Sequence, residues 1–186
     1  LASNGAHEGT NRYEIGNNDL KSEVSLQGDA GIELTNEHVS LDASLFYNHI
    51  NNFIFYERVQ NHAGGDSILT DPETGDQLEV YKFAQQNANL YGAEFSLDVH
   101  PHPLDWLHFK NTFSYTRGKF SQSIDGSDNI PFIPSARLIT TLSADFVRKG
   151  KFVKNIYAGI ESVYNFNQNH PVTGYNTDTA TPGYWL

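Results

Sequence analysis

Residues 24–34, VSLQGDAGIEL, alternate apolar or small side chains with polar ones almost without interruption. Val24, Leu26, Ile32 and Leu34 occupy even positions, whereas polar residues such as Glu33 occupy odd ones. Successive side chains of a β-strand point to opposite faces, so this period of two predicts a strand with one apolar and one wet face. The stretch before it, HEGTNRYEIGNNDLKSE (7–23), is polar and has no such period, which predicts a long loop.

The same alternation recurs along the chain and predicts six strands. In each segment, apolar positions two residues apart oppose Ser, Thr, Asn, Asp or Glu, and no apolar stripe follows a helical spacing. The predicted strands cover residues 22–34, 38–56, 91–99, 107–116, 132–146 and 152–166, and TPGYWL (181–186) opens a seventh. The sequence therefore predicts an all-β fold.

The connections between these strands are of two kinds that alternate along the chain. TNEH (35–38), HPLD (102–105) and RKGK (148–151) are short polar turns. The other connections are long: the opening residues 1–20, then residues 59–80, 121–131 and 167–182. In an up-and-down antiparallel sheet, this alternation places every short turn at one edge and every long loop at the opposite edge.

The length of the strands favours a membrane protein. Several reach 13 to 19 residues, whereas strands of soluble proteins usually have about 3–10 and a tilted strand crosses a bilayer in about 9–11. Aromatic residues near strand ends suit the interfacial girdles of such barrels: Tyr47, Tyr91, Trp106, Tyr115, Tyr164 and Phe166. We interpret the chain as a segment of an antiparallel up-and-down transmembrane β-barrel. A passive porin and a soluble β-sandwich binding module are the alternatives.

Composition removes several classes of function. The chain has no cysteine, which excludes disulfides, thiolate metal sites and cysteine nucleophiles. Its formal net charge of -10 argues against nucleic acid as a partner. Aromatics make up 13% of the residues although the mean hydropathy is only -0.49, a combination that suits strands with one wet face. No nucleophile elbow, phosphate loop or paired-histidine helix is present in the sequence, so we expect a protein that is not an enzyme.

Four motifs resemble those of TonB-dependent outer-membrane receptors, in the order in which that family carries them. RYEIGNNDLKSE (12–23) resembles the signature Gly-Asn-x-x-Leu-Lys-Pro-Glu, with Ser22 where proline is common. NANLYGAEFSL (87–97) is similar to the family's Asn-x-x-x-x-Gly-x-Glu strand, and FIPSARL (132–138) to its Ile-Pro-x-x-Arg strand start. TPGYWL (181–186) is similar to the Thr-Pro-Gly-Tyr start of a late strand. The resemblance spans essentially the whole chain.

The resemblance implies a place within a larger protein. Residues 1–186 would be a partial barrel domain from the C-terminal part of a barrel of about 22 strands. We expect the N-terminal plug, the energy-coupling box and the final strands to lie outside these residues.

The resemblance also implies an activity and partners. The protein would sit among the lipids of the outer membrane of a Gram-negative bacterium, bind a scarce nutrient at the cell surface and import it with TonB-transduced energy. An iron chelate, haem or another metal complex is the expected cargo, with cobalamin or a glycan as alternatives. The TonB complex would act through the N-terminal region, and a surface lipoprotein is a further partner to consider. No cofactor is implied.

Candidate binding residues follow from the predicted topology. The extracellular loops carry donors that suit a metal or an anionic chelate: His7, Glu8, Arg12, Tyr13, His62, Asp66, His170 and Tyr175. The wet face of the strands carries charges that would meet either cargo or the plug: Glu94, Asp98, Arg137, Asp145 and Glu161.

No specific metal site is predicted from the sequence. The loop histidines form no spaced metal motif, and exposed loop histidines are usually solvated. We assign His100 and His102 to the short turn, and His38, His49 and His108 to the rim or wall of the barrel. The acidic stretches 70–77 and 125–129 are read as β-turns rather than calcium loops, because they contain the Pro and Gly of ordinary turns.

Overall fold

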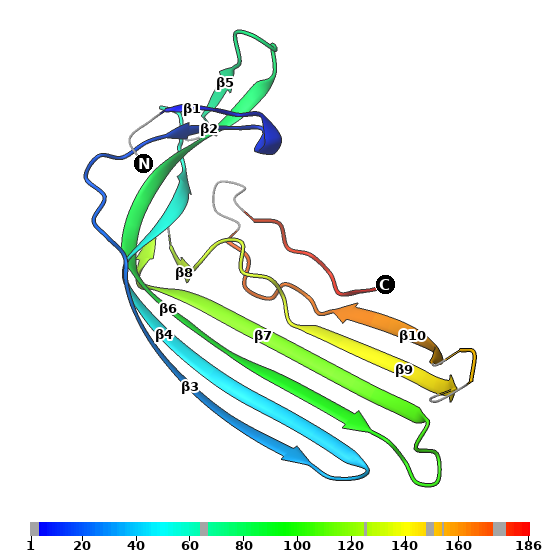
Figure 1. Cartoon of the computed structure of the whole chain (residues 1–186). Coiled ribbons are helices and arrows are strands. Elements are labelled where there is room, and N and C mark those ends of the chain that lie inside the picture. Colours follow the sequence, from blue (N-terminus) through cyan, green and yellow to red (C-terminus); the bar gives the residue numbers. More distant parts are fainter. Residues whose placement is uncertain (1–3, 64–66, 125, 148–150, 154, 173–177) are drawn as a thin grey trace.

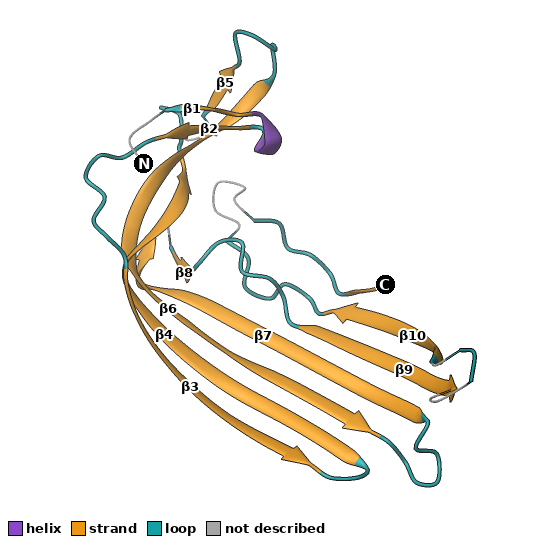
Figure 2. Ribbon diagram, in the orientation of Figure 1, coloured by secondary structure: helices purple, strands orange, loops and turns teal. Residues whose placement is uncertain are grey.

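A computed structural model describes residues 4–63, 67–124, 126–147, 151–153, 155–172 and 178–186. These residues form one curved, open sheet (Figures 1 and 2) whose single helical element is the 3₁₀ turn η1(Glu8–Thr10). Among the described residues, no helix is long and apolar enough to cross a membrane. The all-β prediction is confirmed.

Six long strands form the body of the sheet. They are β3(Val24–Thr35), β4(Val39–Arg58), β6(Gln77–Val99), β7(Leu107–Ile124), β9(Arg137–Val147) and β10(Ile156–Asn165). Each pairs antiparallel with the next, and β11(Tyr184–Trp185) pairs with β10 where the sequence predicts the start of a seventh strand. The predicted up-and-down order is therefore confirmed.

The two kinds of connection separate as expected (Figure 1). The turns from β3 to β4 and from β6 to β7 lie at one edge, together with the facing ends of β9 and β10. We call this the short-turn edge; of the RKGK turn, residues 148–150 lie outside the described residues. The opposite, long-loop edge carries the short strands β1(Gly5–His7), β2(Arg12–Ile15), β5(Ile68–Thr70) and β8(Ser127–Asn129).

Several strand boundaries differ from the sequence prediction, and the differences in β6, β7 and β9 have a physical reason. β6 begins at Gln77 instead of residue 91, and β7 extends to Ile124 instead of 116. These extensions lie beyond the body of the sheet and pair with β2, β5 and β8. Neither of their faces is fixed by lipid, so they do not need to alternate apolar and polar residues. β9 begins at Arg137 instead of 132, because Phe132 has a φ of 62° and Pro134 lacks an N–H. β10 begins at Ile156 instead of 152.

The register aligns apolar side chains across the whole sheet. One row runs through all six long strands: Ile32, Ala43, Phe95, Phe113, Leu138 and Tyr164 are successive partners. Leu26 and Ile160, which share this face, are 75% and 76% exposed. An apolar face this broad, left bare by the protein, is suited to contact with lipid.

Polar side chains also occur on the apolar face, and two of them form a hydrogen-bonded pair. Asn111 of β7 and Thr140 of β9 are register partners, and the Thr140 hydroxyl donates a hydrogen bond of 2.8 Å to Asn111 Oδ1. An unsatisfied polar group in hydrocarbon costs several kcal/mol, so this mutual hydrogen bond allows two polar side chains to face lipid.

The close approach of Phe46 to Gly92 explains the glycine of the predicted NANLYGAEFSL strand. These residues are partners in β4 and β6, and the Phe46 ring lies over the glycine. A Cβ at position 92 would lie 2.5 Å from Phe46 Cε1 and would also contact the Tyr115 carbonyl oxygen. Only a residue without a side chain fits there.

We predict that Gly92→Val destabilises the full-length protein by at least the roughly 1–3 kcal/mol typical of overpacking. The midpoint of thermal unfolding, followed by circular dichroism and by heat-modified gel migration, should fall. Gly28→Ala is the matched control, since a methyl group at Gly28 meets no atom within 4 Å. An unchanged midpoint for Gly92→Val would contradict the close approach of Phe46.

Candidate functional site

The long-loop edge is built by strands that continue past the body of the sheet. β2 pairs in parallel with the start of β6, with Arg12 opposite Glu79, while β5 pairs antiparallel with the same segment. A small core of Phe55, Ala88, Phe120 and Ile130 supports these extensions from the sheet side. Loops far apart in the sequence are therefore held on one rigid base.

Arginine and aromatic side chains from four segments meet at this edge. The Arg12 guanidinium lies 4.7 Å from the centre of the Tyr81 ring and 5.2 Å from that of Phe132. Arg58 lies over Tyr81 as well, at 5.8 Å, and forms an ion pair of 2.6 Å with Glu79. We call these five residues the Arg12 cluster. A guanidinium on aromatic faces keeps its N–H edge available for hydrogen bonds to an anion.

Phe132 is held in an unusual conformation to reach this cluster. Its φ of 62° lies in the left-handed region, which is uncommon for a bulky residue. The Asp178 carboxylate accepts hydrogen bonds from the backbone N–H groups of Phe132, at 3.1 and 3.2 Å, and of Val172, at 3.2 Å. Asp178 thus ties the loop that follows β10 to the loop that follows β8. Strained residues held by such contacts are frequent at binding sites.

The GNNDLKSE signature crosses from β2 to β3 over the β4–β6 pair. Asn17 Nδ2 donates to the Phe83 carbonyl at 3.1 Å. Gln85 binds the Lys21 backbone twice, accepting from its N–H at 2.7 Å and donating to its carbonyl at 2.6 Å. The Glu23 carboxylate accepts from Ile54 N–H beside an irregularity in β4, where Asn52 has a φ of 56°. These contacts give the signature a structural role in fixing the base of the long loops.

We predict that Gln85→Ala loosens this crossing segment. The substitution removes two hydrogen bonds to Lys21 and one of 2.9 Å to the Asn52 carbonyl, and each orphaned backbone group costs about 1–3 kcal/mol where water does not replace the partner. Limited proteolysis should cut residues 16–23 faster in the variant. The control is Gln27→Ala, whose side chain, among the described residues, bonds to Asp29 of its own strand. Equal cleavage rates in both variants would show that Gln85 does not fix the segment.

The structure places the predicted loop residues on separate parts of the long-loop edge. His7 in β1 lies 3.8 Å from Glu14, and Glu8 begins η1. Tyr13 of β2 pairs with Ala6 of β1, and His62 lies in an exposed turn after β4. Asp66 and Tyr175 lie outside the described residues. Arg12, in contrast, is brought into a cluster with side chains of three other segments.

His170, in the loop after β10, has a pKa below its ordinary value. Burial is the main cause, and the positive charges of Arg117 and Lys119 add to it, while Asp128 opposes the shift. Lys119 is itself paired with Asp128 at 2.6 Å. Because the folded protein disfavours the charged imidazolium, folding becomes less favourable as the pH falls and the histidine is protonated. Cargo binding by the loop histidines stays a prediction.

The predicted wet-face residues divide into two groups. Glu94 lies opposite Ser114, Glu161 accepts a hydrogen bond of 3.3 Å from Thr141, and Arg137 lines an open cavity of about 570 Å³ near the long-loop edge. Asp98 and Asp145, in contrast, converge at the short-turn edge on histidines that the sequence analysis assigned to turn and wall.

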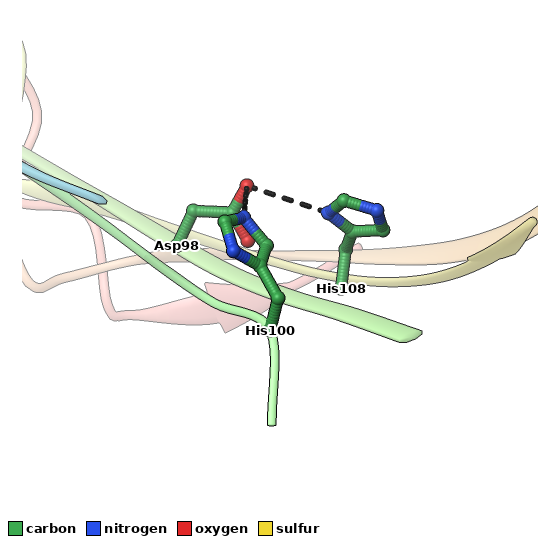
Figure 3. Close-up of side chains that lie close together, drawn as sticks. All are labelled: Asp98, His100 and His108. Carbon is green, nitrogen blue, oxygen red and sulfur yellow. Dashed lines mark ion pairs between the residues drawn. The ribbon is translucent and has the colours of Figure 1, made fainter. Parts of the chain in front are cut away.

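Figure 3 shows three residues of this second site, Asp98, His100 and His108. Asp98 Oδ2 lies 3.3 Å from His100 Nε2 and 3.7 Å from His108 Nδ1, and His108 Nε2 lies 3.8 Å from Asp145 Oδ2. The sequence carried one signal that could have found it, since Asp98 and His100 are two residues apart and share a face if the strand period continues. The position of His108 depends on the register of β6 against β7, which the sequence does not specify.

Comparison with known proteins identifies the class to which this fold belongs. The family described as "TonB dependent receptor-like, beta-barrel" matches residues 1–186. The chain therefore belongs to the TonB-dependent receptor β-barrel family, a family of outer-membrane receptors and transporters rather than of enzymes. The resemblance of the four motifs is confirmed.

Solved structures share the fold at low sequence identity. The copper transporter OprC is 16% identical with a TM-score of 0.69, over 91% of this chain and 23% of its own. The siderophore receptor PirA from Acinetobacter baumannii is 16% identical with a TM-score of 0.52, over 94% and 26%. The ferric enterobactin receptor PfeA of Pseudomonas aeruginosa, as a mutant, is 18% identical with a TM-score of 0.54, over 93% and 24%. This chain thus spans about a quarter of the length of these proteins.

Proposed function

We propose that this chain is part of a transporter that binds a scarce nutrient at the cell surface and imports it with energy delivered by TonB. The observation that carries the proposal is the family match along all 186 residues, on a sheet whose long loops gather at one edge. Barrels of the outer membrane have short periplasmic turns and longer extracellular loops. The long-loop edge would accordingly face the outside of a Gram-negative cell.

An anionic metal chelate is the cargo that the long-loop edge suits best. The Arg12 cluster offers a guanidinium positioned by two aromatic rings, and such a group binds carboxylate or catecholate oxygens and stacks on flat ligands. The structural neighbours include a copper transporter, a siderophore receptor and a ferric enterobactin receptor. From the Arg12 cluster, we infer that this chain also binds a metal chelate. Haem fits the same description, because it combines a flat ring with carboxylates.

The wet face of the sheet would then line the lumen. We propose that Glu94, Asp98, Arg137, Asp145 and Glu161 face the plug or the passing cargo, since all lie on the polar side of their strands. TonB would act through an N-terminal region that these residues do not include, and outer-membrane lipid would contact the apolar face.

A passive porin would share the strand pattern but is the weaker alternative. The matched family is one of TonB-dependent receptors, and four of its motifs occur in order in this chain. A soluble sandwich would bury its apolar strand faces between two sheets, whereas the described strands form one sheet with a bare apolar face.

We predict that Arg12→Ala weakens binding of anionic chelates to the full-length receptor by about tenfold, which corresponds to about 1.4 kcal/mol. The loss combines the positive charge with the stacking on Tyr81 and Phe132. Arg12→Lys should recover only part of the affinity, because an ammonium group lacks the planar fork. Binding would be measured by tryptophan fluorescence with ferric catecholate, ferric citrate and haem in turn.

The matched control is Lys151→Ala at the short-turn edge, where the ammonium lies 5.9 Å from the Phe152 ring. It removes a cation–aromatic contact of the same kind far from the loops and should leave binding unchanged. Uptake of the bound chelate should also stop in cells that lack TonB. TonB-independent uptake would instead establish a passive pore.

A further inference from the structure

We propose that Asp98, His100 and His108 form a site for a divalent transition-metal ion such as Zn²⁺, supported by Asp145. We call these four residues the short-turn metal site. It lies at the edge opposite the Arg12 cluster, and metal binding there is separate from the binding of cargo by the loops.

The three donor atoms are already close to the arrangement that a metal requires. They lie within 4.8 Å of one another, and the two measured pairs that include Asp98 are 3.3 and 3.7 Å apart. In a tetrahedral site with ligand bonds of roughly 2.0–2.1 Å, neighbouring donors lie about 3.3 Å apart. Small side-chain rotations would therefore bring both imidazole nitrogens and the carboxylate onto one ion.

The donor set selects a class of metal. Two imidazole nitrogens and one carboxylate oxygen suit Zn²⁺, Cu²⁺, Ni²⁺ or Fe²⁺, whereas Ca²⁺ and Mg²⁺ prefer oxygen ligands throughout. Asp98 is well placed to contribute charge, because its Oδ1 atom is buried and finds no hydrogen-bond partner among the described residues. Its second oxygen faces both histidines.

Asp145 supplies the outer contact that histidine ligands of metals usually have. His108 would bind the ion through Nδ1, and its other nitrogen, Nε2, lies 3.8 Å from the Asp145 carboxylate. A carboxylate that comes within hydrogen-bonding distance of this nitrogen would fix the orientation and the tautomer of the ring and make the ligating nitrogen more basic. The site thus has an outer shell as well as three ligands.

The site is open to an incoming ion. The Asp98, His100 and His108 side chains are 25%, 21% and 29% exposed. An open cavity of about 560 Å³ adjoins them and is lined by Glu37, His38, His100, His102, Asp105 and His108. A fourth coordination position can therefore be filled by water or by a donor from a bound molecule.

A bound ion would join the end of β6 to the start of β7. Asp98 belongs to β6, His100 follows it, and His108 belongs to β7 beyond the connecting turn. The ion would cross-link the short-turn edge, which the proposed function places in the periplasm; that location alone rests on the proposed function.

The test is Zn²⁺ binding to the purified full-length receptor, carried on a tag without histidines and first stripped with a chelator. Calorimetry should give one more equivalent of Zn²⁺ for the unaltered protein than for His100→Ala or His108→Ala. Asp145→Asn should keep the site but weaken it by about 10–100-fold. Cu²⁺ bound at the site should show couplings to two imidazole nitrogens by electron paramagnetic resonance, and at most one of these should remain with His108→Ala.

His102→Ala is the matched control. His102 belongs to the same turn and lines the same cavity, but it pairs with Asp105 rather than Asp98. It should retain the full stoichiometry, and heat-modified gel migration should show that every variant is folded. Equal Zn²⁺ stoichiometry and affinity in the folded His100→Ala, His108→Ala and unaltered proteins would overturn the proposal, whatever the cargo of the receptor proves to be.

Discussion

A bilayer offers no hydrogen-bond partner to the backbone, and this constraint governs the rest of the structure. Every N–H and C=O group that crosses the hydrocarbon must pair within the protein, which for strands requires continuous antiparallel neighbours. The inner strands β4, β6, β7 and β9 have antiparallel neighbours on both sides, whereas among the described residues β3 pairs with β4 alone and the second side of β10 meets only the short β11. The sheet stays open within this chain, so the closed barrel of the family requires further strands at both edges.

The two edges of the sheet depart from that regular pattern in different ways. At the long-loop edge, strands continue past the body of the sheet and pair with short segments. Side chains of these extensions and of the adjoining loops form the Arg12 cluster and the contacts of Asp178. At the short-turn edge, the chain reverses tightly, which brings Asp98, His100 and His108 together. Both clusters of interacting charged and aromatic side chains thus lie where the regular alternation of apolar and polar residues along the strands ends.

The long strands could be predicted from the sequence because lipid on one face of the sheet requires an apolar residue at every second position. This alternation is visible in a single sequence. The strands, their order and the separation of short from long connections were all readable in this way. The extensions of β6 and β7 were not, because neither of their faces is fixed by lipid. The clusters were missed for another reason: Arg12 meets Tyr81 only through the parallel β2–β6 pairing, and His108 meets Asp98 only through register.

The orientation of the sheet in the membrane is the central claim, and the chain offers a direct measurement because it contains no cysteine. Glu73 lies in an exposed turn at the long-loop edge, and Glu37 in an exposed turn at the short-turn edge. Single Glu73→Cys and Glu37→Cys variants of a full-length receptor without other reactive cysteines would be treated in intact cells with a membrane-impermeant maleimide. Labelling of the first variant alone, with the second labelled only after the outer membrane is opened, is the predicted result. Equal labelling of both variants in intact cells would contradict the account.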